Sequence, residues 1–244
     1  MFFVAWGIEI AILLLEILFL PKPQPTEDFL PYVVVSVVLL YGYCLLAPIL
    51  LERFLQRRAM RDILNLRRYR IFQHAISGLL TGDRSWIPRD RDLRHEILPF
   101  LAEVLLLGIV INDAIACWGM LLSERVRYAM LVPIVAAPFP EEFFFRGYLF
   151  RGMIGHDLPP LRTEELLKKE NVKAAAVSTV LFIIPHLIGA YLQQMLTLEY
   201  AVGSMVELTL FSMLTCIAYS WSKDIILPSL LHAFCNDMQW VLRL

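Results

Sequence analysis

Two adjacent acids and an arginine interrupt an apolar stretch, APFPEEFFFRGYLF, at residues 137–150. An ionisable side chain at bilayer depth costs about 2.5–3.5 kcal/mol on insertion scales, so it requires a partner or a function. Glu142 and Arg146 are four residues apart with the acid first, the favourable order for an ion pair on one helix face. Glu141 is rotated by about 100° from Glu142 in an α-helix. We therefore predict that Glu142 and Arg146 neutralise each other, while Glu141 is available for proton transfer.

Prolines lie beside these candidate residues. Pro140 directly precedes the two acids, and Pro133 and Pro138 are just upstream. Because proline is tolerated in the first turn of a helix and disrupts its interior, we predict a broken helix that restarts at about Pro140. The acids would then lie in a first turn, where unpaired N–H groups favour anions. Pro185 should free the carbonyl of Leu181 and open a wet pocket in a second helix wall.

Two histidines and an amide lie in other apolar runs. LFIIPHLIGA contains His186, and LLHAFCNDMQW places His232 and Asn236 four residues apart on one helix face. Counted along their helices at about 1.5 Å per residue, the two histidines reach a depth similar to that of Glu141. We expect three non-adjacent segments to bring these four side chains into one layer.

The elements that hold these residues are predicted to be membrane-spanning helices. Hydrophobic residues form 58% of the 244 positions and the mean hydropathy is +0.62. Runs near the ~20 residues that a spanning helix needs occur at 2–20, 30–51, 97–122, 128–150, 174–198, 200–221 and 225–241. The run 71–80 is too short to cross alone. The sequence predicts an all-α, polytopic transmembrane bundle of about seven to eight spans in one domain, 1–244, with a motif-bearing core at about 128–241.

Basic residues are distributed unevenly between the two sides of this bundle. The loop 52–96 holds eleven Arg, and 151–173 with Lys223 add six more basic residues, against four on the opposite side. By the positive-inside rule the basic loops and the N-terminus are cytoplasmic, in an integral, multi-pass protein of the inner membrane if the cell is prokaryotic. Within the long loop, residues 67–80 read either as an interfacial amphipathic helix or as a solvated basic segment.

Other polar residues in the spans are weaker candidates. Glu103, Asn112, Asp113 and Glu207 have no partner at a characteristic spacing, which favours interhelical hydrogen bonding. The aromatic run Phe143–Phe145 is expected to face lipid or to pack in the core. The cysteines are scattered singly, which argues against a disulfide framework or a cysteine zinc site: Cys44, Cys117, Cys216 and Cys235.

Three short motifs occur in order in separate segments. They are Glu141-Glu142-x-x-x-Arg146, Phe182-x-x-x-His186 and His232-x-x-x-Asn236. Together they resemble the CPBP family, which includes CAAX prenyl proteases of the Ras-converting type and bacteriocin-processing or abortive-infection membrane proteins. The resemblance covers 141–236, and residues 1–136 share only a helical, hydrophobic character with it.

The resemblance implies a glutamic-type intramembrane endopeptidase without a metal or other cofactor. Glu141 would activate water as a base, and His186 would share that water. His232 and Asn236 would donate to the oxyanion, and the neighbouring ion pair would hold the half-helix in place. The implied partners are the bilayer and a membrane-associated protein or peptide, with no nucleic acid. The site is expected to open towards the cytoplasmic half.

Two other interpretations remain at this stage. A zinc-dependent membrane peptidase would use His186, His232 and a glutamate as ligands, although no HExxH-type pair is present. A non-catalytic immunity factor, scaffold or transporter is the other, although transport would favour internal repeats with paired broken helices. The residues leave the substrate open among a prenylated C-terminal motif, a leader peptide and a C-terminal sorting tail.

Overall fold

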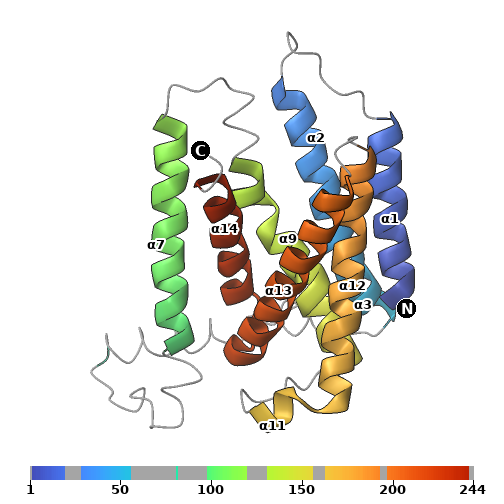
Figure 1. Cartoon of the computed structure of the whole chain (residues 1–244), viewed down its shortest axis with the longest axis vertical. Coiled ribbons are helices and arrows are strands. Elements are labelled where there is room, and N and C mark those ends of the chain that lie inside the picture. The colour runs from blue at the N-terminus through green and yellow to red at the C-terminus, as the bar shows by residue number, and fades with distance from the viewer. Residues whose placement is uncertain are drawn as a thin grey trace.

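The computed structural model describes residues 2–19, 29–55, 81, 98–119, 131–155, 163–192 and 197–241. The regular elements in these residues are all helical (Figure 1). Before the candidate site they are α1 (Phe2–Phe19), α2 (Phe29–Tyr41), η1 (Gly42–Leu46), α3 (Ala47–Leu55) and α7 (Leu98–Gly119). The remainder are η4 (Val132–Ala136), α9 (Pro138–Glu142), η5 (Phe143–Phe150), α10 (Arg151–Met153), α11 (Thr163–Leu166), α12 (Lys169–Leu192), α13 (Leu198–Ser222) and α14 (Ile226–Val241).

Four helical stretches in the described residues are long and apolar enough to cross a membrane. They are Val33–Arg53, Leu98–Ala116, Lys169–Tyr191 and Leu198–Ser222. The all-α prediction is confirmed, but the expected count of seven to eight spans is not. Two physical reasons are visible: α14 has only 16 residues, and the segment from 132 to 153 is divided into short helical pieces.

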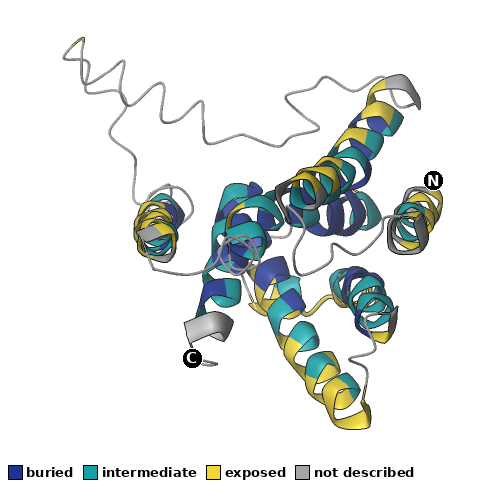
Figure 2. Cartoon of the chain, turned by 90° about the horizontal axis from the view of Figure 1, so that it is seen from above, coloured by how far each residue is buried: buried dark blue, intermediate teal, exposed yellow. Residues whose placement is uncertain are grey.

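The divided segment from η4 to α10, which we call the broken helix, lies at the centre of the fold. Helix α14 packs against its first part and against α7, while α12 and α13 pack against η5. Seen from above, buried residues gather on these central elements and exposed residues cover the outward faces of the surrounding helices (Figure 2). The motif-bearing segments therefore meet around one central element.

Prolines determine where the broken helix changes its pitch. The N–H of Ala137 bonds to the carbonyl of Val132 at 3.0 Å, a five-residue bond that widens the turn. Pro138 has no N–H to donate, and the regular helix restarts there, two residues before the predicted position at Pro140. Glu141 lies in the first turn of this new helix, as the sequence predicts.

The three phenylalanines that follow the acids belong to the protein core. Phe143, Phe144 and Phe145 are each at most 1% exposed. The ring of Phe145 packs edge-to-face on Phe182 of α12, with centroids 5.0 Å apart, and Ser178 donates a 2.8 Å hydrogen bond to the carbonyl of Phe145. This ties η5 to α12, so the packing alternative is correct and the lipid-facing one is wrong.

The opening expected beside Pro185 is filled by an N-terminal side chain. The indole Nε1 of Trp6 in α1 donates a 3.1 Å hydrogen bond to the carbonyl of Leu181, four residues before the proline. A buried carbonyl without a donor would cost about 1–3 kcal/mol, more than a typical hydrogen bond contributes. The carbonyl is thus bonded to α1 and does not line a wet pocket.

This bond leads to a double-variant prediction. Trp6→Phe should lower the free energy of unfolding by about 1–3 kcal/mol, because the Leu181 carbonyl loses its donor. In a Pro185→Ala background, residue 185 supplies its own N–H to that carbonyl, and Trp6→Phe should then cost clearly less. Reversible unfolding in mixed micelles measures all four proteins. If Trp6→Phe lowered the free energy of unfolding equally in both backgrounds, Trp6 would not be the donor that replaces the missing N–H of Pro185.

Some expectations concern parts of the chain that lie outside the described residues. These are the proposed interfacial helix within 67–80 and most of the basic loop 52–96. Among the described residues, Cys44, Cys216 and Cys235 form no disulfide; the first two are buried and Cys235 is partly buried.

Candidate active site

The predicted ion pair is present at the floor of the site. Glu142 and Arg146 are both 0% exposed, with Glu142 Oε2 3.1 Å from Arg146 Nε. This separation is that of an ion pair, although the N–H does not point at the oxygen well enough to count as a hydrogen bond. The guanidinium lies over the ring of Phe182 at 4.6 Å, with Phe145 and Phe211 at 6.0 and 5.9 Å. Charge and aromatic faces together hold the buried arginine.

Glu142 has a second partner that the local spacing could not reveal. Its Oε1 lies 2.9 Å from Nδ1 of His232, a residue on α14 ninety positions away in the chain. A carboxylate beside an arginine accepts hydrogen bonds, so Nδ1 of His232 is the donor. Glu142 therefore fixes the orientation of His232 and also neutralises Arg146. The ring of His232 also packs edge-to-face on Phe211, with centroids 4.6 Å apart.

Glu141 lies on the open side of the broken helix and faces two histidines. Its side chain is 18% exposed, and its Oε2 is 4.0 Å from Nε2 of His186 and 3.9 Å from Nε2 of His232. Both separations are too long for a direct hydrogen bond and are suited to one bridging water. The structure thus brings one carboxylate and two imidazole nitrogens together around a single point.

The tautomer of His186 follows from its other ring nitrogen. Nδ1 lies 2.8 Å from the carbonyl oxygen of Phe182, which only accepts, so Nδ1 donates. In a neutral ring, Nε2 is then unprotonated and carries a lone pair that faces Glu141. The ring also packs on Phe182 with centroids 4.5 Å apart, so one residue both supports and orients the imidazole.

Asn236 is bound to the break in the helix. Its Nδ2 donates a 2.7 Å hydrogen bond to the carbonyl of Pro133. That carbonyl lacks its usual donors because the N–H of Ala137 turns to Val132 and Pro138 has none. The amide satisfies it with one hydrogen and has a second N–H to offer. The four-residue spacing predicted a shared face with His232, whereas this role depends on the tertiary structure.

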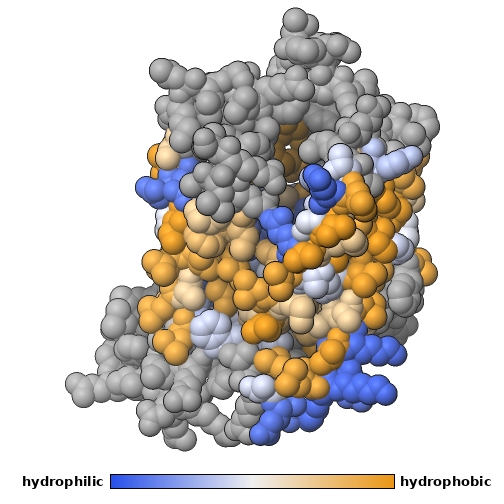
Figure 3. Space-filling model, viewed as in Figure 1, coloured by the Kyte–Doolittle hydropathy of each residue, from blue (hydrophilic) through white to orange (hydrophobic). Residues whose placement is uncertain are grey.

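A cavity of about 470 Å³ adjoins this cluster between α12, α13 and α14. His186, His232 and Asn236 line it together with Glu207, Ser204 and Tyr200 of α13. Figure 3 shows a few hydrophilic residues within the apolar part of this face, beside a hollow, and further hydrophilic residues towards the end where α11 lies. Glu207 was expected to serve interhelical bonding, and its place in the wall adds a site residue. The sequence feature that could have pointed to Glu207 is its position one helical turn before Phe211, the residue that packs on His232.

The cavity extends away from the basic loops. Its lining comes mostly from the part of α13 that follows Leu198 and the part of α14 towards Val241, away from α11 and from the turn that joins α13 to α14 (Figure 1). Between the candidate residues and the end of the bundle with the basic loops, three side chains pack into one cluster and are at most 2% exposed: Phe150, Tyr219 and Ile225. The sequence placed the opening on the side of the basic loops, whereas the described cavity lies towards the other end of the bundle, because aromatic and aliphatic side chains fill the basic end.

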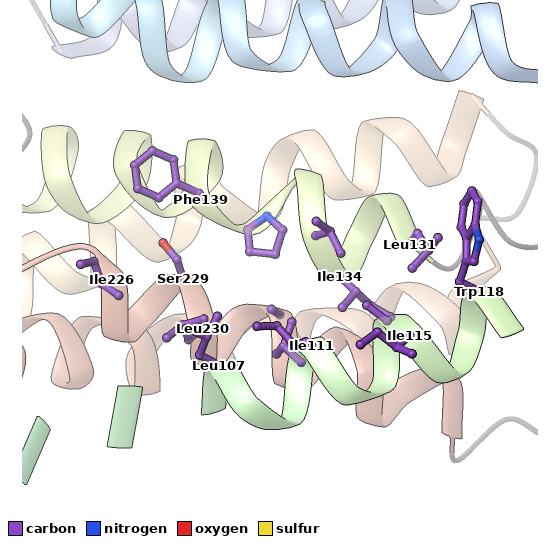
Figure 4. A pocket seen from close by; sticks show the side chains of 15 residues that line it. Leu107, Ile111, Ile115, Trp118, Leu131, Ile134, Phe139, Ile226, Ser229 and Leu230 are labelled. Carbon is purple, nitrogen blue, oxygen red and sulfur yellow. The ribbon is translucent and has the colours of Figure 1, made fainter. Parts of the chain in front are cut away.

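A second cavity of about 590 Å³ lies on the other side of α14, between α7 and the broken helix. The side chains of Ile111 and Ile115 on α7 and of Ile134 on η4 point into it (Figure 4). Its lining is almost entirely apolar, and it contains none of the candidate catalytic residues. Among the described residues, the candidates for proton transfer therefore lie beside the smaller cavity and not beside this one.

A metal centre is the other arrangement that these donor types could form. In the part of the chain that the structure describes, no group of three or more His, Cys, Asp or Glu side chains is arranged to hold a metal ion. The two histidine Nε2 atoms at 3.9–4.0 Å from Glu141 instead leave a space of the size that one water needs.

The described fold is all-helical, has four helices long and apolar enough to cross a membrane, and brings Glu141, His186 and His232 together at its centre. Residues 123–238 match the family model of the type II CAAX prenyl endopeptidases that are Rce1-like. The match covers slightly less than half of the chain, agrees with the resemblance that the three motifs indicate, and supports a CAAX-protease-like intramembrane endopeptidase in general. No curated protein and no solved structure matches the chain.

Proposed function

We propose that this protein is a glutamic-type intramembrane endopeptidase in which Glu141 and His186 activate a water molecule. The observation that carries the proposal is the convergence of Glu141 Oε2 with two histidine Nε2 atoms at 3.9–4.0 Å. The burial of His232 and the separate orientation of each imidazole support it, because preorganised groups lose little freedom at the reaction step. The family match supports the same class of reaction.

The geometry suggests how the water is held. Carboxylate and unprotonated Nε2 both accept hydrogen bonds, so the two hydrogens of one water satisfy Glu141 and His186. The remaining lone pair of the water is then directed at the substrate carbonyl. In the proposed step, Glu141 takes a proton as the oxygen–carbon bond forms, and the tetrahedral intermediate results.

His232 and Asn236 are the proposed donors to the oxyanion. The Nδ1–H of His232 donates a hydrogen bond to Glu142 and stays on the ring. For Nε2 to donate as well, the imidazole must carry a proton on each ring nitrogen. The second N–H of Asn236 is the other donor. When the carbon–nitrogen bond breaks, the proton held by Glu141 passes to the leaving amine, which restores the carboxylate and balances the reaction.

The substrate class that best fits this site is a membrane-associated protein or peptide. The catalytic layer lies among apolar helices, and the adjoining cavity of about 470 Å³ is in the range of ligand-binding clefts. We place the protein in the membrane as a multi-pass protein with its basic loops and N-terminus on the cytoplasmic side. A prenylated motif, a leader peptide and a sorting tail all remain compatible.

Comparison of protein termini tests the proposal. Membranes from cells that express the wild-type protein should contain new N- and C-terminal peptides that are missing with Glu141→Gln at equal expression. Mass spectrometry of enriched termini identifies them and the substrate together. Identical termini in both strains would contradict a protease and favour an immunity or scaffold role.

A metal-chelation prediction separates the glutamic mechanism from the zinc alternative. Purified protein dialysed against a strong chelator should retain cleavage activity within about twofold, because the proposed nucleophile needs no Lewis acid. A known zinc peptidase in the same detergent serves as the positive control. Loss of activity that added zinc restores would instead assign His186 and His232 as ligands.

A further inference from the structure

The larger, apolar cavity has no role in the proposed mechanism. It measures about 590 Å³, and none of the described residues that line it is charged. The hydroxyl of Ser229, in its wall, already donates a 2.7 Å hydrogen bond to the carbonyl of Ile225. A buried water needs about two to four polar partners, so these walls disfavour water. An empty apolar cavity is also unfavourable, because its walls lose dispersion contacts. The chemistry of the walls therefore calls for a hydrocarbon occupant.

The cavity is elongated and has the length of one lipid leaflet. Its lining on α7 runs from Leu107 to Trp118, and Figure 4 shows the labelled side chains in a row that ends at Trp118. The rise from Leu107 to Trp118 is about 16 Å, which is about half of the ~30 Å hydrocarbon core of a bilayer. Tryptophan is enriched at the interface between lipid and water, which suits its place at the end of such a cavity.

The cavity is open to the side of the bundle. Helix α7 stands at one edge, beside α14 (Figure 1), and its segment Leu98–Ala116 is long and apolar enough to cross a membrane. Side chains of α7 that line the cavity are also exposed on the outer surface, among them Ile111 and Ile115. In a membrane, the material that meets this opening is the acyl chains of neighbouring lipids.

Helix α14 separates this cavity from the catalytic one. Leu230 and Ala233 line the apolar cavity, whereas His232 and Asn236 line the catalytic cavity. A helix with its side chains is about 10–12 Å thick. A lipid attached to a substrate residue beside the cleaved bond would have to pass around α14 to enter. This separation favours a bilayer lipid over a lipid carried by the substrate.

We propose that the apolar cavity binds one acyl chain of a bilayer phospholipid, in the leaflet at the Trp118 end of α7. The inference rests on the proposed placement in the membrane and does not depend on proteolysis. The chain would enter between α7 and the broken helix and replace the missing contacts with its own dispersion contacts. The headgroup would remain outside, at the interface beside Trp118.

The floor of the cavity connects the proposed lipid site to the catalytic layer. Val110, Ile134 and Ala233 form one buried cluster there, with one residue each from α7, η4 and α14. Ile134 follows Pro133, whose carbonyl accepts the hydrogen bond from Asn236. A bound chain would therefore pack against the segment that anchors Asn236.

The first test locates the chain by photolabelling. The protein is placed in phosphatidylcholine nanodiscs that contain the same lipid with a diazirine in the middle of one acyl chain, and mass spectrometry locates the adducts. Ile134 is 1% exposed and should be labelled only from within the cavity. The exposed residues Leu101 and Leu105 of α7, which do not line it, report labelling by surrounding lipid. We expect Ile134 to be labelled at a level comparable to these two residues.

A matched pair of variants tests whether the cavity is the site. Ala114 lines the cavity, whereas Ala116 lies two positions further along α7, is exposed and does not line it. Ala114→Phe should fill the space and lower the ratio of adducts at Ile134 to adducts at Leu105 by at least about fivefold. Ala116→Phe adds the same ring outside the cavity and should leave the ratio within about twofold of the wild-type value.

The second test measures binding through stability. Phosphatidylcholine added to the protein in micelles should raise the thermal midpoint of the wild type and of Ala116→Phe by about 2–4 °C, because a ligand that binds the folded state stabilises it. Ala114→Phe should gain clearly less. Val135→Phe fills the cavity from η4 and provides a second variant if Ala114→Phe does not fold.

Each outcome has a defined meaning. Labelling of Leu101 and Leu105 without Ile134, or an Ile134 signal that Ala114→Phe and Val135→Phe leave intact, overturns the lipid site alone. Loss of the Ile134 signal on addition of a lipid-modified substrate peptide, but not of the same peptide without its lipid, assigns the cavity to the substrate and also overturns the proposal. Absence of labelling at all three positions contradicts the placement in the membrane as well. The comparison of termini with Glu141→Gln decides the protease proposal separately.

Discussion

Glu141→Gln should lower kcat/KM for peptide cleavage by about 10²–10⁴-fold, because the amide cannot take a proton from water. The fall should be seen in kcat more than in KM, since the carboxylate is proposed to act on the water and not on the substrate. Among the described residues, the Nε2 atoms of the two histidines lie 3.9 and 4.0 Å from its carboxylate, too far for a direct hydrogen bond. The folded yield and thermal stability should therefore remain close to those of the wild-type protein.

The appropriate control for this variant is Glu142→Gln, the same change at the adjacent position. It removes one charge from a fully buried carboxylate that contacts both Arg146 and His232. We expect Glu141→Gln to be folded and inactive, and Glu142→Gln to be poorly folded. If Glu142→Gln were stable and inactive while Glu141→Gln retained activity, the roles of the two acids would be exchanged.

Glu142→Gln should lower the free energy of unfolding by about 3–5 kcal/mol. Removing one partner of a buried ion pair leaves the other charge uncompensated. Arg146 is 0% exposed and lies among aromatic rings, so water cannot replace the lost carboxylate. Chemical unfolding in mixed micelles, with the folded fraction followed by far-UV circular dichroism, measures the loss.

A double variant distinguishes the structural role of the pair from its catalytic role. Glu142→Leu with Arg146→Met replaces both charges by apolar side chains of similar size, a change that is often neutral or stabilising. This variant should recover most of the lost stability. Cleavage activity should remain strongly reduced, because His232 has lost the acceptor that orients its Nδ1. Full activity in a stable double variant would show that Glu142 serves only to balance charge.

Local spacing was sufficient for features that lie within one helix. The Glu142–Arg146 pair follows from the helical period, which places residues four apart on one face. The break before the acids follows from the missing N–H groups of proline, although the helix restarts at Pro138 and not at Pro140. The all-helical fold follows from long apolar runs, because only internally bonded backbone is stable in lipid.

Contacts between helices required the tertiary structure. The sequence showed that Pro185 frees the Leu181 carbonyl, but not that Trp6 of the first helix would bond it. It showed His232 and Asn236 on one face, but not that Glu142 and Pro133 would be their acceptors. The rotation and tilt of each helix decide these partners, and both depend on side-chain packing against neighbours.

The direction of the cavity shows most clearly what packing decides. The positions of Glu141 and the two histidines along their predicted helices placed them at a similar depth. The structure brings Glu141 to within 3.9–4.0 Å of both histidines. The opening lies away from the basic loops because Phe150 and Tyr219 fill the other end of the bundle. The sequence by itself determined which ionisable residues lie in apolar segments and which neighbours they pair with along a helix. Only the tertiary structure decided on which side of these residues a cavity remains, because that depends on how side chains from distant segments fill space.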